Sequence, residues 1–228
     1  MKILSIIKAG STFASTARRF GDFEDWIISG LGSVPCQVEV VDAVHGGGLP
    51  EPGDCCGVVV TGSHAMVTDD LPWSLGIERW IPGLVDAGVP FLGICYGHQL
   101  LGRAAGGVVG YHPLGPEAGT VSIRLADEAR QDRLFDGIPE TFAAHATHSQ
   151  SVLALPPDAV RLAGNAFEPN HAFRVGRCAW GVQFHPEYSS EVMAAYLEQD
   201  APDGVSAAEA PWAGRVLRNF ATIACRER

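Results

Sequence analysis

The residue best suited to nucleophilic chemistry is Cys95, which lies in the segment Gly93-Ile94-Cys95-Tyr96-Gly97. An apolar run over 89–94 predicts a strand before it, and a helical pattern begins directly after it. This pattern is typical of a nucleophile elbow, a sharp strand-to-helix turn that needs small neighbours on both sides of the nucleophile. The turn directs the side chain at a helix N-terminus, whose partial positive charge favours a thiolate. A buried cysteine in a glycine-rich strand is the alternative interpretation.

A cysteine nucleophile needs a base, and the base needs a group that orients it. His185 is the best candidate, because the apolar run 179–184 carries it to the end of a predicted strand. Pro186 ends that strand, so Glu187 can fold back and accept a hydrogen bond from the imidazole. In open parallel sheets, sites gather at the carboxyl ends of strands. A surface histidine beside a proline turn is the alternative.

A third feature is the glycine turn Thr61-Gly62-Ser63, which follows the apolar run 57–60. Acyl transfer needs two hydrogen-bond donors where the tetrahedral oxyanion forms. The backbone N–H groups of Gly62 and Tyr96 are the candidates for these donors. A plain β-turn is the alternative interpretation of the same three residues.

The elements that must position these residues alternate between strands and helices in the first half of the chain. Strands are predicted at 3–7, 37–41, 57–60 and 89–94, and helices at 20–27 and 77–85. Such alternation predicts parallel β-α-β units with right-handed crossovers. The strand at 89–94 is almost wholly apolar, as expected for a strand that helices cover on both faces.

The second half of the chain predicts shorter strands and two closing helices. The strands fall at 121–125, 142–147, 160–163, 172–175 and 179–184, the helices at 191–197 and 214–225, and a loop at 199–210. Residues 121–125 alternate between apolar and polar, which predicts an antiparallel strand with one exposed face. We see no repeat or linker and expect a single domain over 1–228. The expected fold is a three-layer α/β fold with a mostly parallel sheet and antiparallel additions.

Composition excludes several classes of protein. A formal net charge of −10 argues against a nucleic-acid-binding surface. No apolar run is long enough to span a membrane, and the N-terminus lacks the pattern of a signal peptide, so we expect a cytoplasmic protein without membrane contact.

The other cysteines and histidines carry no recognisable site in the sequence. We expect ordinary thiols rather than a disulfide framework at Cys36, Cys55, Cys56, Cys178 and Cys225. No nearby carboxylate or cysteine completes a metal site around His145 and His148, so we expect no metal.

Taken together, three segments resemble the class I (triad) glutamine amidotransferase family. They are G-I-C-Y-G-H-Q-L-L-G at 93–102, V-Q-F-H-P-E at 182–187, and V-V-V-T-G-S at 58–63. The resemblance covers essentially the whole chain and is greatest to free-standing members similar to the amidotransferase domain of GMP synthetase. It implies a flavodoxin-like sheet, a Cys95–His185–Glu187 triad, and an oxyanion hole formed by Gly62 and Tyr96.

The resemblance also implies contacts between the protein and its substrate. Gln99 would contact the substrate, and the backbone of the segment that contains His148, Ser149 and Gln150 would hold its amino acid head. The chain departs from the family where a Gly-Gly-Pro turn is usual, since it has Ser63 in place of the proline. It departs again at Gln150, where an aspartate or an aromatic residue is common. Both departures lie at the substrate end and favour a substrate other than plain glutamine.

Three functions remain open at this point. The first is a glutaminase-type amidotransferase, which forms a thioester on Cys95 and passes ammonia to a separate acceptor-activating synthetase subunit. The second is a γ-glutamyl peptidase that needs no partner. The third is a non-enzymatic binding or redox-sensing domain similar to PfpI-type proteins, against which the complete His-Pro-Glu segment argues. The substrate would be glutamine or another γ-glutamyl compound, and no cofactor is expected.

Overall fold

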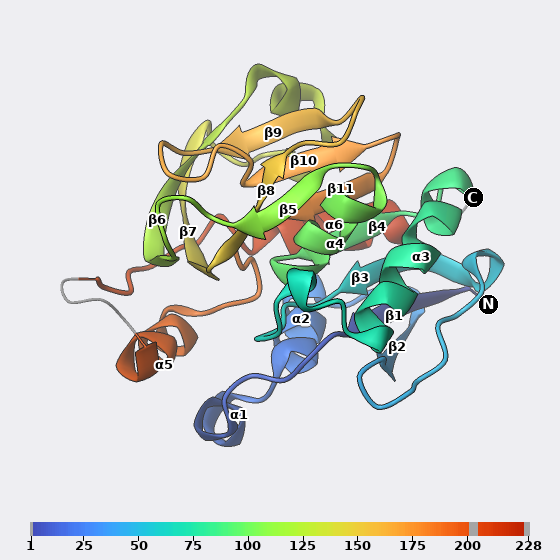
Figure 1. The fold of residues 1–228 in the computed structure, drawn as a ribbon, viewed down its shortest axis with the longest axis horizontal. Helices are drawn as coiled ribbons and strands as arrows, with labels where there is room; N and C mark the ends of the chain where they lie inside the picture. The colour runs from blue at the N-terminus through green and yellow to red at the C-terminus, as the bar shows by residue number, and fades with distance from the viewer. Residues whose placement is uncertain (1, 201–204, 226–228) are drawn as a thin grey trace.

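The parallel half of the sheet carries the candidate catalytic residues. The computed structural model describes residues 2–200 and 205–225. Five strands of it pair in parallel: β2 (Gln37–Asp42), β1 (Ile3–Lys8), β3 (Cys55–Val60), β4 (Phe91–Ile94) and β11 (Ala179–Val182). Figure 1 shows them side by side, with their carboxyl ends directed the same way. The three central strands are buried on both faces, which explains their nearly continuous apolar sequences.

The sheet continues through four antiparallel strands. They are β10 (Ala172–Val175), β9 (Val160–Gly164), β6 (Glu117–Leu125) and β7 (Thr141–His148). The full order is β2-β1-β3-β4-β11-β10-β9-β6-β7. The structure therefore confirms the predicted change from parallel to antiparallel pairing in the second half of the chain.

A separate pair of strands was missed in the sequence. It joins β5 (Val108–Tyr111) to β8 (Gln150–Ala154) in antiparallel register. The residues of β5 are exposed or half-buried, so they lack the alternation that marks a strand with one buried face. β5 forms because it pairs with β8, a distant segment, and the local sequence contains no pattern that predicts it.

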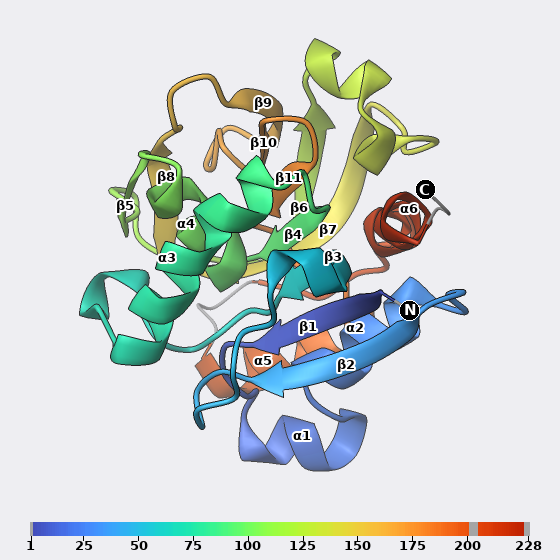
Figure 2. The same ribbon diagram turned by 90° about the vertical axis from the view of Figure 1, so that its right-hand side faces the viewer.

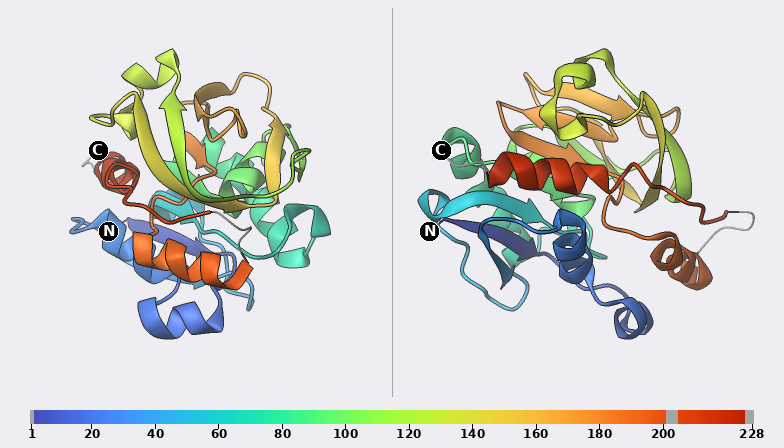
Figure 3. Two further views of the ribbon diagram at one scale, coloured as in Figure 1. Left: turned by 90° about the vertical axis from the view of Figure 1, so that its left-hand side faces the viewer. Right: turned by 180° about the vertical axis from the view of Figure 1, so that it is seen from behind.

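Helices cover both faces of the sheet. The helices α2 (Phe23–Leu31) and α6 (Arg215–Ala224) pack on one face, where Ile27 and Phe220 meet Val59 of β3. The helices α3 (Pro72–Asp86) and α4 (Tyr96–Ala104) cover the other, where Ile77 meets the neighbouring Val58. Figures 2 and 3 show these two layers with the sheet between them. The three-layer, flavodoxin-like expectation is confirmed.

Two further helices, α1 (Ala14–Phe20) and α5 (Ser190–Asp200), lie beside one another at the carboxyl-end side of the parallel strands. The prediction of one helix over 20–27 was wrong, because the chain breaks at Gly21, whose φ is +83°. Asp22 then caps α2 by accepting from the Phe23 N–H at 2.9 Å. The predicted loop at 199–210 begins inside α5, and residues 201–204 of it lie outside the described residues. No helix of the described part is long and apolar enough to cross a membrane.

A disulfide between Cys36 and Cys225 links the residue before β2 to the residue after α6. The expectation that both are ordinary thiols was wrong. They lie 189 residues apart in sequence, with Cα atoms 6.1 Å apart, because α6 packs across the sheet. Such proximity has no signature in cysteine spacing.

We expect four of the six cysteines to react with a thiol reagent in the denatured, unreduced protein, and six after reduction. Cys36→Ser should lower the free energy of unfolding by about 2–4 kcal/mol, since the crosslink restricts the unfolded chain. Urea unfolding measures this change. Cys56→Ser is the matched control, because it keeps the disulfide. Six reactive thiols without reduction would contradict the crosslink.

Candidate active site

The turn at Cys95 joins β4 directly to α4. Cys95 has φ +49° and ψ −95°, a backbone conformation that a residue with a side chain rarely adopts. A Cβ atom on Gly97 would lie 2.5 Å from the carbonyl oxygen of Val60, and one on Gly93 would overlap the carbonyl of Gly97. Both glycines of the G-x-C-x-G segment are therefore required by close packing, as the elbow interpretation predicts.

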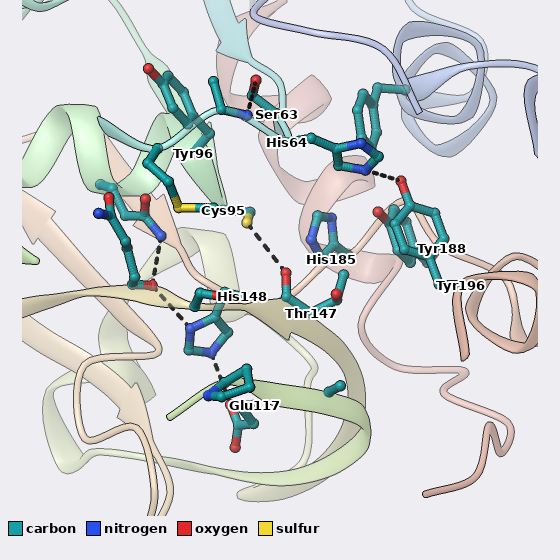
Figure 4. A pocket seen from close by; sticks show the side chains of 18 of the residues that line it. Ser63, His64, Cys95, Tyr96, Glu117, Thr147, His148, His185, Tyr188 and Tyr196 are labelled. Atoms are coloured by element: carbon teal, nitrogen blue, oxygen red, sulfur yellow. Dashed lines mark hydrogen bonds and ion pairs between the residues drawn. The ribbon is translucent and has the colours of Figure 1, made fainter. Parts of the chain in front are cut away.

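The parallel pairing of β11 with β4 brings His185 to the same edge of the sheet. The Cys95 N–H donates to the carbonyl of Val182 at 2.8 Å, and the His185 N–H donates to the carbonyl of His145 at 2.8 Å. His185 Nδ1 donates to Glu187 Oε1 at 2.7 Å. The other ring nitrogen, Nε2, makes no hydrogen bond to the described residues. Figure 4 shows the ring beside Cys95, whose thiol donates to the Thr147 carbonyl at 3.9 Å. The imidazole thus stands between a carboxylate and a thiol.

This arrangement determines the charge of His185, which is only 2% exposed. Burial disfavours the imidazolium, but the charges of Glu187 and Cys95 outweigh that cost and raise the pKa of His185 to about 10. The ring therefore holds its proton near neutral pH in the resting site.

The turn after β3 lies against the same pair of side chains. A Cβ atom on Gly62 would lie 3.2 Å from His185 Cε1 and 3.9 Å from Cys95 Cβ. The Thr61 hydroxyl accepts from the Ala9 N–H and donates to the Gly62 carbonyl, both at 2.9 Å, which holds the turn. Tyr96 is the first residue of α4, so its N–H has no intrahelical acceptor. The two expected oxyanion donors therefore both border Cys95.

The predicted substrate residues line a single cavity of about 480 Å³ together with Cys95 and His185. The side chain of Gln99 donates to the Gln150 carbonyl at 2.7 Å, and that of Gln150 donates to Thr68 Oγ1 at 2.6 Å. His148 donates from Nδ1 to the same Gln150 carbonyl at 3.0 Å. These side chains hold the polar end of the cavity in shape, and their assignment as substrate contacts stays a prediction.

Glu117 is a residue that the sequence analysis missed. It accepts from His148 Nε2 at 3.0 Å and from Asn165 Nδ2 at 2.9 Å, and it lies 3.1 Å from His171 Nε2. The expectation that no carboxylate lies near His148 was therefore wrong. Burial would raise the pKa of Glu117, but these hydrogen bonds outweigh it and hold the pKa well below its usual range. Antiparallel pairing of β6 with β7 places Glu117 opposite His148, 31 residues away, and no motif marks that pair.

The opposite end of the cavity is aromatic, which the sequence analysis also missed. Its wall contains Phe13, His64, Tyr188 and Tyr196. They come from the segment before α1, the turn after β3, and the segment around α5. Only Tyr188 carried a local signal, since it directly follows Glu187.

Within the described residues, three potential metal-ligand side chains come together away from the cavity. The sulfur atoms of Cys36, Cys56 and Cys225 lie within 4.8 Å of one another. Because Cys36 and Cys225 form a disulfide, they offer no thiolate to a metal.

Gly97→Ala should lower the free energy of unfolding by about 1–3 kcal/mol, because the new methyl group collides with the Val60 carbonyl. The control is Gly76→Ala in α3, where a Cβ meets nothing within 4 Å. That change should stabilise by up to about 1 kcal/mol through helix propensity. Urea unfolding of the two variants tests the packing of the elbow, and equal effects would contradict it.

The pairing of His185 with Glu187 predicts a pH dependence of stability. In the folded protein His185 keeps its proton to about pH 10, whereas the ordinary pKa is 6.5. The folded state therefore binds more protons between these values, so this contribution is complete below about pH 6.5 and is lost as the pH rises toward 10. Glu187→Gln should make the decrease in the free energy of unfolding over this pH range smaller.

Unfolding free energies of Glu187→Gln and the parent at about pH 6.5 and about pH 9.5 measure the difference. The matched control is Glu191→Gln, at an exposed carboxylate that makes no contact with His185. The same pH slope in the parent and in Glu187→Gln would show that Glu187 does not set the charge of His185.

Comparison with known proteins shows the family of this chain. Residues 20–201 match the family described as glutamine amidotransferase class-I. The chain is 35% identical over 146 residues to a GMP synthase (glutamine-hydrolysing) from Aeropyrum pernix, which covers 62% of this chain and 27% of that protein. It is 30% identical over 196 residues to γ-glutamyl peptidase 4 from Arabidopsis thaliana, covering 84% of this chain and 77% of that protein.

Solved structures show the same fold. A glutamine amidotransferase from Methylobacillus flagellatus superposes with a TM-score of 0.73 at 22% identity, covering 100% of this chain and 97% of that one. One from Thermotoga maritima gives 0.76 at 19% identity and covers both chains completely. With the match over 20–201, these comparisons show that the chain belongs to the class I glutamine amidotransferase family of enzymes.

Proposed function

We propose that this protein hydrolyses γ-glutamyl amides through a thioester on Cys95, with His185 as base and acid and Glu187 as its orienter. The observation that carries the proposal is the buried imidazole between the Glu187 carboxylate, 2.7 Å from Nδ1, and the Cys95 thiol at the elbow. A base held in this way next to a cysteine has a use in nucleophilic catalysis and none in simple binding.

The first half of the reaction forms the thioester. The Cys95 thiolate attacks the δ-carbonyl carbon, and a C–S bond forms while the carbonyl oxygen becomes an oxyanion. The N–H groups of Gly62 and Tyr96 would stabilise that charge. As the intermediate collapses, the C–N bond breaks and the His185 imidazolium gives its proton to the departing nitrogen. The amine leaves, and a γ-glutamyl thioester remains on Cys95.

The second half releases glutamate. The neutral imidazole of His185 takes a proton from water, and the resulting hydroxide attacks the thioester carbon. The C–S bond then breaks and restores the thiolate beside the imidazolium. Glu187 holds the ring in one orientation and balances its charge through both halves. The polar end of the cavity, with Gln99, Ser149 and Gln150, would hold the α-amino acid head of the substrate.

Two fates of the leaving nitrogen are compatible with this chemistry. Release of an amine is favoured by the likeness to a γ-glutamyl peptidase over 77% of that protein's length. Ammonia transfer to a separate acceptor-activating subunit is the second candidate. It is supported by the likeness to GMP synthases, of which this chain spans about a quarter (27% for one). The two candidates share the same site and differ in the group attached to the nitrogen.

Cys95→Ala should lower the hydrolysis of γ-glutamyl amides by at least about 10³-fold, because the nucleophile is lost. Mass spectrometry of the quenched parent should show a γ-glutamyl adduct on the peptide that contains Cys95. The matched control is Cys56→Ser, outside the cavity, which should keep parental activity. Equal turnover by Cys95→Ala would overturn the proposed function.

The same assay separates the two fates of the nitrogen. The isolated chain is expected to cleave substituted γ-glutamyl amides faster than glutamine. The opposite result would be slow turnover of every substituted amide together with glutamine hydrolysis that becomes faster when a synthetase subunit is added. That result would assign ammonia transfer to this protein.

A further inference from the structure

The position of His185 defines where the leaving group must lie. His185 protonates the departing nitrogen, so the group attached to that nitrogen lies on the His185 side of Cys95. Figure 4 shows His148 on another side of Cys95 from the tyrosines. Gln99 and His148 both donate to the Gln150 carbonyl, so these residues form the end of the cavity where the amino acid head would bind. Figure 4 shows that the side chains beyond His185 are those of His64, Tyr188 and Tyr196. The cavity therefore has one polar end and one aromatic end, with the reacting atoms between them.

The aromatic end consists of Phe13, His64, Tyr188 and Tyr196, which we call the aromatic wall. Tyr188 stacks on His185 with ring centroids 4.0 Å apart and an interplanar angle of 22°. Tyr196 follows at 5.1 Å from Tyr188, and Phe13 lies 5.2 Å from Tyr196 and 4.3 Å from His64. The rings thus run without a break from the catalytic imidazole to the far end of the cavity.

Hydrogen bonds hold the wall in place. The Tyr196 hydroxyl lies 2.7 Å from Thr12 Oγ1 and 3.2 Å from His64 Nε2. These contacts join α5 to the segment before α1 and to the turn after β3. Tyr188 and Tyr196 are buried, while Phe13 is half-buried and His64 is exposed. The wall is therefore a preorganised surface that is open on one side, where a ring of the substrate can lie against it.

The wall carries no charge near neutral pH. The His64 ring loses water where it packs against Phe13 and Tyr196, and this desolvation, together with the charge of His185, lowers the pKa of His64, so its imidazole is neutral. Burial raises the pKa of Tyr196 to about 12. The residues that line the cavity include no lysine or arginine. A carboxylate on the leaving group, as in a γ-glutamyl amino acid, would therefore find no cationic partner in the wall itself, and the neighbouring His185 imidazolium is already paired with Glu187.

We propose that the aromatic wall is a subsite for the leaving group and that the preferred substrates are γ-glutamyl amides of uncharged aromatic amines. Aromatic rings of the substrate and the wall would pack in stacked or edge-to-face contact. The inference rests on the proposed function, since it takes the position of the leaving group from the role of His185.

Three synthetic substrates test the proposal because they differ in one property at a time. They are γ-glutamylphenethylamide, γ-glutamyl-(2-cyclohexylethyl)amide and γ-glutamylphenylalanine. The first should exceed the second in kcat/KM by about two- to tenfold, because ring contacts add to apolar burial. It should exceed the third by about tenfold or more, because the additional carboxylate loses water without gaining a partner.

Phe13→Leu removes one ring of the wall and keeps an apolar side chain. The ratio of kcat/KM for the phenethylamide to that for the cyclohexylethylamide should fall toward one. The matched control is Phe167→Leu, which removes a ring that stacks on His112 outside the cavity, and the ratio should stay at the parental value. The ratio of the two kcat/KM values in the parent protein needs no substitution. The proposal can therefore be tested even where a variant does not fold.

Equal rates for the phenethylamide and cyclohexylethylamide, or faster cleavage of γ-glutamylphenylalanine, would overturn the proposal. Hydrolysis of glutamine through Cys95 without cleavage of any of the three substrates would overturn it too, and would leave the proposed function standing. Absence of both hydrolysis and a thioester on Cys95 would overturn the two together.

Discussion

The contact between Gly97 and the carbonyl of Val60 is the constraint on which the rest of the site depends. It lets α4 start directly above β3, because no side chain separates the two backbones. Cys95 has a positive φ in this turn, and Gly62 lies so close that a Cβ atom on it would be 3.9 Å from Cys95 Cβ. A nucleophile and its two candidate oxyanion donors thus come from one close packing of backbone on backbone. Any larger residue at position 97 separates all three.

The second determinant of the site is the buried pairing of His185 with Glu187. An isolated imidazolium at this depth would be strongly disfavoured, and the carboxylate 2.7 Å away offsets that cost. The same interaction therefore stabilises the folded site and holds the His185 imidazole protonated and in one orientation. Glu117 has a similar role at the polar end, where its carboxylate pairs with His148 and His171 and holds both rings in place. Two buried carboxylates, each paired with histidine, thus shape the two sides of the cavity.

The two ends of the cavity come from different parts of the fold. The strand ends that carry Cys95, His185 and Gly62 belong to the sheet. Three members of the aromatic wall, Phe13, Tyr188 and Tyr196, belong to segments outside the sheet, around α1 and α5. Changes in those outer segments can alter the leaving-group end of the cavity while the packing of the elbow stays as it is.

Local sequence was enough to predict the elbow at Cys95, the strand that carries His185, and the parallel order of the first half. Each depends on neighbours in the chain: glycines two residues from the nucleophile, an apolar run, and a proline after the histidine. The break between α1 and α2, the pairing of β5 with β8, and the Cys36–Cys225 disulfide could not be predicted in that way. Glu117 and the aromatic wall could not be predicted for the same reason.

The residues of each group lie far apart in the sequence, up to 183 residues between Phe13 and Tyr196, and only the folded chain brings them together. Local sequence thus identifies the atoms that could react. Their charge and the shape of the cavity in front of them depend on contacts between distant segments, so both arise only when the chain folds.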